Sequence, residues 1–243
     1  MPFLHSCCIC QSRLAAWQPG PCSSCASALC PAPTLRPQAP LRALWARWWC
    51  VGTTYDMILR WKIRPTRRLD ELLMLTNACD DAEMEWLRSR RGILVPIPQR
   101  FERAWQLGHS PATRLALTLS RTARRSNHAL PVVPLLRPSR PDSDLRRQVG
   151  LAGQERWNRD RRWTIDLTHL PPEETEVILV DDVITTGATL ASAARAIQNF
   201  GYPRISAWVL GARPSFSADA WTSTRVAVSS SAPKTCSRAA LGP

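Results

Sequence analysis

Lysine is almost missing from this sequence of 243 residues: only Lys62 and Lys234 are lysines among 32 basic residues, so arginine carries nearly all of the formal net charge of +13. A positive charge of this size favours encounters with anionic partners, phosphates and nucleic acid alike, without choosing between them. A lysine kept at position 62 indicates either a need for a compact ammonium group or a solvated surface cation, and both interpretations stay open.

Long apolar segments are missing as well. Residues 1–10 contain no basic start followed by an apolar core of about 7–15 residues, so no secretory leader is expected. The longest aliphatic run, Val177 to Val180, is far too short to cross a bilayer. We therefore expect a soluble, cytoplasmic protein with no membrane-inserted segment.

Cysteine is plentiful but unevenly placed, since six of the nine cysteines fall in the first thirty residues. Four of them form two CxxC pairs separated by eleven residues: Cys7, Cys10, Cys22 and Cys25. Two such knuckles supply four thiolates, which suits tetrahedral structural Zn²⁺. Cys8 and Cys30 are spare and could replace a ligand, and a redox role for either pair is the alternative interpretation.

The domain organisation follows from proline and periodicity. Residues 31–40 carry four prolines, which cannot continue a helix or a central strand. We therefore predict a small zinc-binding module with a proline-rich linker over 1–40 and one larger domain over 41–213. Residues 214–243 are rich in Ser, Thr and Ala without any periodicity and are predicted to form a poorly defined tail.

Strands and helices are predicted to alternate in the larger domain. Helical periodicity indicates a helix over about 67–90, and residues 92–98 form a short buried strand that enters a proline-stiffened loop. Pro111 stands in the first turn of a further helix. Another strand is predicted over 130–136 and another helix over 145–156.

The segment 177–189, VILVDDVITTGAT, carries the strongest functional pattern. Its first four residues are typical of a strand buried on both faces of a parallel sheet. A helix is predicted after Thr189, with Gly201 at its end, and the next strand over 205–210 completes a βαβ unit.

Asp181 and Asp182 follow the predicted strand, at the edge where open parallel sheets bind ligands. Next comes a loop that enters a helix N-terminus, where free N–H groups and the helix dipole favour a phosphate. Its members are Thr185, Thr186, Gly187, Ala188 and Thr189. Each feature alone also fits an ordinary helix cap or a solvated strand end, but their order favours a phosphate site with ribose-binding carboxylates. A GxGxxG fingerprint and a Walker lysine are both absent.

This segment resembles the phosphoribosyl diphosphate (PRPP) motif of type I phosphoribosyltransferases. The resemblance implies an α/β fold with a mainly parallel twisted sheet flanked by helices. It also implies that Asp181 and Asp182 contact the ribose hydroxyls, that the loop holds the 5′-phosphate, and that Mg²⁺ bridges pyrophosphate and ribose oxygens. Such an enzyme releases pyrophosphate from ribose C1 through an oxocarbenium-like centre, which needs electrostatic positioning and no nucleophile. His109 and His128 could be proposed as bases, but isolated histidines without a visible partner are more often structural, so they are left unassigned.

Other segments resemble the ComF family, amidophosphoribosyltransferase-like proteins of bacterial competence and DNA uptake. They are Trp61–Arg64, Val95–Pro98, Gln148, Leu151, Glu155, Arg156 and Asn158. The resemblance implies substrate or pyrophosphate contacts at Lys62 and Pro98. At 107–111, LGHSP, the chain lacks the arginine and asparagine of that family, and Arg100 or Arg103 could substitute.

The runner-up function is a non-catalytic competence adaptor that binds nucleotide or single-stranded DNA. Residues 137–163 contain eight arginines interleaved with Trp157 and Trp163, a composition suited to backbone contacts and base stacking. The competing interpretation of this stretch is a loop that closes over PRPP. The acceptor substrate and the oligomeric state have no signature in the sequence.

Overall fold

The computed structural model describes residues 6–7, 9–14, 21–32, 35–63, 81–99, 110–139 and 163–214. Some predicted features lie outside these residues: most of the helix over 67–90, the helix over 145–156, most of the tail, Cys8, Arg100, Arg103 and His109.

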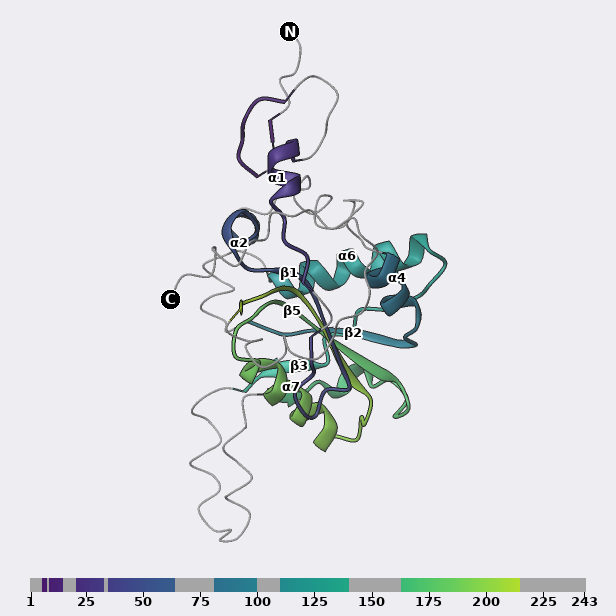
Figure 1. Cartoon of the computed structure of the whole chain (residues 1–243). Helices are drawn as coiled ribbons and strands as arrows, with labels where there is room; N and C mark the ends of the chain where they lie inside the picture. The colour runs from purple at the N-terminus through teal and green to yellow at the C-terminus, as the bar shows by residue number, and fades with distance from the viewer. Residues whose placement is uncertain are drawn as a thin grey trace.

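A sheet of four parallel strands forms the centre of the described part of the chain (Figure 1). The strand order is β1 (Ala43–Trp49), β6 (Ile205–Ala212), β5 (Glu176–Ile184) and β2 (Gly92–Pro96), and every neighbouring pair is parallel. Every residue from 177 to 180 is fully buried in β5, because both faces of a parallel sheet are covered. The predicted α/β class with a mainly parallel sheet is confirmed.

Helices cover both faces of this sheet (Figure 1). On one face lie α2 (Gly52–Ile63), α4 (Asp81–Arg88) and α6 (Pro111–Arg125), and on the other lies α7 (Ala188–Asn199). Because side chains alternate along a strand, the interior divides into two cores. In β6, for example, Trp208 packs into the core beside α2, α4 and α6, while the neighbouring residues 207 and 209 pack into the core beside α7.

The predicted βαβ unit is β5–α7–β6, in which two adjacent parallel strands are joined by one helix. Helix α7 begins at Ala188, slightly earlier than predicted, because Gly187 forms its N-cap. Gly201 follows the helix with φ of 119°, a left-handed conformation that glycine adopts without strain. Strand β6 continues two residues beyond the predicted end at position 210, to Ala212.

The prediction of a strand over 130–136 is largely wrong. Only one isolated parallel bridge, between Leu94 and Val132, occurs there, and β3 (Leu136–Pro138) begins at the end of the predicted range. Pro131 and Pro134 lack the N–H groups that a continuous ladder needs. Strand β3 instead pairs antiparallel with β4 (Trp163–Ile165) in a separate two-stranded ribbon.

The N-terminal residues reach the sheet along the edge strand β1. Isolated antiparallel bridges join Pro31 to Trp48 and Leu35 to Leu44, and the N–H of Ala32 donates to the carbonyl of Arg47 (3.0 Å). The domain boundary near residue 40 stays a prediction. No helix in the part of the chain that the structure describes is long and apolar enough to cross a bilayer.

An arginine and a glutamate form a buried ion pair between the sheet and α4. Arg47 Nε lies 3.5 Å from Glu83 Oε2, with both side chains only 2% exposed. The indole N–H of Trp208 donates to Glu83 Oε1 at 2.8 Å. A buried carboxylate is tolerated only when its oxygens are satisfied in this way.

Replacing Trp208 by Phe is expected to lower the free energy of unfolding by about 1–3 kcal/mol, since the substitution removes the indole donor to a buried carboxylate oxygen. Urea denaturation measures the effect. Trp45→Phe is the matched control, because the Trp45 indole N–H is buried and has no hydrogen-bond partner among the described residues. An equal loss of stability in the two variants would show that ring packing, and not the hydrogen bond, is responsible.

Candidate functional site

The acidic pair lies within β5, not after it as predicted, because the strand runs on to Ile184. Asp181 is paired in register with Val209 of β6. Asp182 is buried, with 7% of its surface exposed, whereas Asp181 is half-buried. Both carboxylates nonetheless belong to the C-terminal half of a parallel strand, toward the edge where such sheets bind ligands.

The loop after β5 is short and largely exposed, and it ends at a left-handed glycine. Thr185 and Thr186 are exposed, and Gly187 has φ of 75° and ψ of −4°, in the left-handed region. Glycine has no side chain to cap a helix, so residue 187 supplies no side-chain hydrogen bond to the first-turn N–H groups of α7. The N–H of Ala188 has a long contact of 3.4 Å to Thr186 Oγ1. Thr189 is exposed in the first turn of the helix.

Gly187→Ala is expected to lower the free energy of unfolding by about 1 kcal/mol or more, because an alanine is strained in the left-handed region. It should also weaken anion binding at the loop, since the first turn of α7 must shift. Gly201→Ala is the control, because it introduces similar strain at the other end of α7. Calorimetric titration should show a lower affinity for ribose 5-phosphate in Gly187→Ala than in Gly201→Ala. Equal affinities of the two variants would contradict a role for the loop in ligand binding.

Lys62 joins this site from a distant part of the sequence. It lies in the last turn of α2, and its Nζ is 2.8 Å from Asp182 Oδ2. The two side chains are 18% and 10% exposed, respectively, so the ion pair is largely shielded from water. Lys62 is therefore not a solvated surface cation.

Two further residues approach the same edge, and neither was identified from the sequence. Cys50 directly follows β1 and is buried, and its N–H donates to the carbonyl of Ala212 at 2.8 Å. Burial raises the pKa of Cys50 to about 11, against the positive charge of Arg213. The N–H of Arg213 donates to the carbonyl of Ile184 at the end of β5 (2.9 Å). A single buried cysteine and one arginine among many carry no sequence signal that marks them.

The remaining predicted residues lie as follows. Pro98 comes directly after Ile97, whose N–H donates to the carbonyl of Val180 at 2.9 Å, so the predicted VPIP loop leaves the sheet beside β5. His128 follows α6, and its N–H donates to the carbonyl of Ala123 as part of the helix end. Of the arginine-rich stretch, the structure describes Arg137, which donates to Asp166 from Nε at 2.9 Å and is thus already paired.

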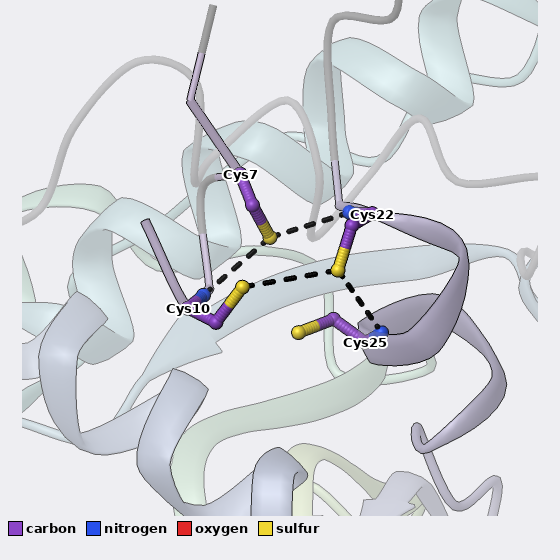
Figure 2. A group of neighbouring side chains, drawn as sticks. All are labelled: Cys7, Cys10, Cys22 and Cys25. Carbon is purple, nitrogen blue, oxygen red and sulfur yellow. Dashed lines mark hydrogen bonds between the residues drawn. The ribbon is translucent and has the colours of Figure 1, made fainter. Parts of the chain in front are cut away.

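A second candidate site is the cysteine cluster, where the four predicted cysteines come together (Figure 2). Their sulfur atoms all lie within 4.8 Å of one another. Tetrahedral zinc with Zn–S bonds of about 2.3 Å requires sulfurs about 3.8 Å apart. The distance between Cys10 Sγ and Cys22 Sγ is 3.8 Å. The four side chains could therefore hold a metal ion such as zinc.

Backbone N–H groups point at these sulfurs, as a thiolate requires. The N–H of Cys22 lies 3.2 Å from Cys7 Sγ, and the N–H of Cys25 lies 3.4 Å from Cys22 Sγ (Figure 2). Burial works to raise the pKa of Cys7, but hydrogen bonds from backbone N–H groups outweigh it and lower that pKa. A hydrogen bond from Ser12 lowers the pKa of Cys10 to about 6. Burial raises the pKa of Cys25.

The cysteine cluster packs against α2. The guanidinium of Arg60 donates to the carbonyl of Ile9, between the first two cysteines. Cys7, Ile9 and Cys25 share a hydrophobic core with Trp61. Helix α1 (Ser23–Ser27) carries Cys25 and is capped by the side chain of Cys22. Cys30 is disulfide-bonded and does not belong to the cluster.

No model of a known protein family matches this chain, and no curated protein is significantly similar to it.

Proposed function

We propose that this chain has a type I phosphoribosyltransferase fold and binds PRPP or a related phosphoribosyl compound. One observation supports this above all: the carboxylates of Asp181 and Asp182 are followed by a turn with left-handed Gly187 that opens the N-terminus of α7. Carboxylates in the C-terminal half of a parallel strand suit ribose hydroxyls, and a helix N-terminus preceded by a glycine suits a phosphate. Both belong to the C-terminal part of β5 and the turn after it, and β5 lies between the parallel strands β6 and β2.

In this proposal the chain binds and orients the ligand. Asp181 and Asp182 accept hydrogen bonds from the ribose hydroxyls, and the loop from Thr185 to Thr189 donates N–H and hydroxyl groups to the 5′-phosphate. When bound, Mg²⁺ neutralises pyrophosphate charge and keeps several waters, as a hard cation that prefers phosphate oxygens. The acceptor attacks ribose C1, the bond from C1 to the pyrophosphate oxygen breaks, and pyrophosphate leaves with the electron pair.

Two measurements test the proposal. Calorimetric titration should show binding of ribose 5-phosphate and of PRPP, the latter in the presence of Mg²⁺. An assay for pyrophosphate should then detect its release from PRPP when candidate nucleobases or amines are added. Binding without release would assign the chain to the non-catalytic adaptors, and the absence of binding would refute the site.

We also propose that the cysteine cluster binds one structural Zn²⁺ ion. Four thiolates with two CxxC knuckles form a closed tetrahedral set, which is typical of structural and not of catalytic zinc. The N–H groups around Cys7 and Cys22 fit deprotonated sulfur. The ion would hold together residues that have little apolar core of their own.

A cellular role in competence and DNA uptake is a proposal that rests on the resemblance to the ComF family. Two segments of that resemblance lie at the candidate site: Lys62 contacts Asp182, and Pro98 leaves the sheet beside β5. Natural transformation of a deletion strain, with and without the wild-type gene, tests the role. Unchanged transformation would contradict it.

A further inference from the structure

Each carboxylate of the acidic pair is held by a different group. Asp181 Oδ1 accepts a hydrogen bond from the N–H of Asp182 at 2.8 Å, a contact within the strand itself. Asp182 Oδ2 lies 2.8 Å from Lys62 Nζ, which belongs to another element, α2. The orientation of Asp182 thus depends on α2, whereas that of Asp181 is supported locally.

Helix α2 is well placed to present Lys62 at a fixed point. Met57, Ile58 and Trp61 are all fully or almost fully buried against the sheet. A Cβ atom at Gly211 of β6 would lie only 2.8 Å from Ile58 Cδ1, so helix and strand are in close contact there. In the same turn as Lys62, Arg60 is bound to the carbonyl of Ile9. The last turn of α2 is therefore anchored on two sides.

We propose that Lys62 is a positioning residue that acts through Asp182, and not a ligand of the pyrophosphate. The inference rests on the proposed function, which makes Asp182 a ribose contact. A carboxylate this shielded from water is costly to keep charged unless a partner lies close. Lys62 supplies that charge and, as a donor, fixes the direction of the second oxygen toward the ligand. A compact ammonium suits this role, in a chain whose only other lysine is Lys234.

The two possible roles of Lys62 are separated by two ligands, because PRPP carries a pyrophosphate and ribose 5-phosphate does not. Lys62→Met removes the charge and keeps the length of the side chain. If Lys62 positions Asp182, this variant should lower the affinity for both ligands by the same factor. A factor of about ten is expected, which lies in the range of coupling energies between residues in direct contact. If Lys62 instead binds pyrophosphate, only the affinity for PRPP should fall, and the inference is overturned.

A double-mutant cycle gives the second readout. Lys62→Met in an Asp182→Asn background should cost little further affinity, since the partner through which it acts has lost its charge. Lys62→Arg keeps the charge and should recover part of the affinity lost in Lys62→Met. Arg124→Met, which removes an exposed positive charge from the last turn of α6, controls for the change in net charge. Thermal unfolding of every variant shows whether the fold is kept.

Two outcomes distinguish the inference from the proposed function. If wild type binds the ligands but Lys62→Met and Asp182→Asn are strictly additive, the positioning role is overturned and the proposed function stands. If wild type binds neither ligand, the proposed function fails and the inference fails with it.

Discussion

Replacement of Asp181 and Asp182 together by asparagine is expected to weaken binding of ribose 5-phosphate by at least about 100-fold, because a hydrogen bond to a charged group contributes about 1.5–3 kcal/mol and about 1.4 kcal/mol is tenfold. Asparagine keeps the size of each side chain while removing the charged acceptors. Calorimetric titration of both proteins with ribose 5-phosphate and with PRPP measures the loss.

The control for this double variant is Asp166→Asn. Asp166 is also a carboxylate paired with a basic residue, Arg137, and it accepts a hydrogen bond from the N–H of Thr168. It lies in a different part of the molecule, before the short 3-10 helix at Leu167–His169. Its substitution should leave ligand affinity unchanged. Equal affinity for the wild type and the Asp181/Asp182 variant would refute the acidic pair as the ribose site.

Replacement of Cys22 and Cys25 together by serine is expected to reduce bound zinc from about one ion per chain to none, since half of the thiolate ligands are lost. Metal binding and folding of such a small module are coupled, so the N-terminal residues should become sensitive to proteolysis. Elemental analysis of the purified protein and limited proteolysis measure the two effects.

Cys50→Ser is the matched control for the metal prediction. Cys50 is also a free cysteine, but it is buried at the sheet edge and is not part of the cysteine cluster. Its substitution should leave the zinc content at about one ion per chain. Purified wild-type protein that contains no zinc, and in which Cys7 and Cys22 are oxidised, would support the redox alternative instead.

Much of the fold was predictable because the signals are local. The apolar run in β5, the apolar stripe of α7 and Gly201 at its end lie in one stretch of sequence, and all three have the predicted structure. Strand β1 was not identified, since its sequence ALWARWW mixes aromatic residues with an arginine. That arginine is buried beside Glu83, a charged partner that lies far away in the chain.

The sequence by itself determined the α/β class, the order of strand, loop and helix around the acidic pair, and the two CxxC pairs, because each of these depends on residues that are close neighbours in the chain. Only the tertiary structure decided which side chains meet. The ion pair between Lys62 and Asp182 and the contact between Arg60 and Ile9 join residues that are far apart in the chain. Such contacts arise from how α2 packs on the sheet, and a single sequence carries no periodicity or spacing that records them.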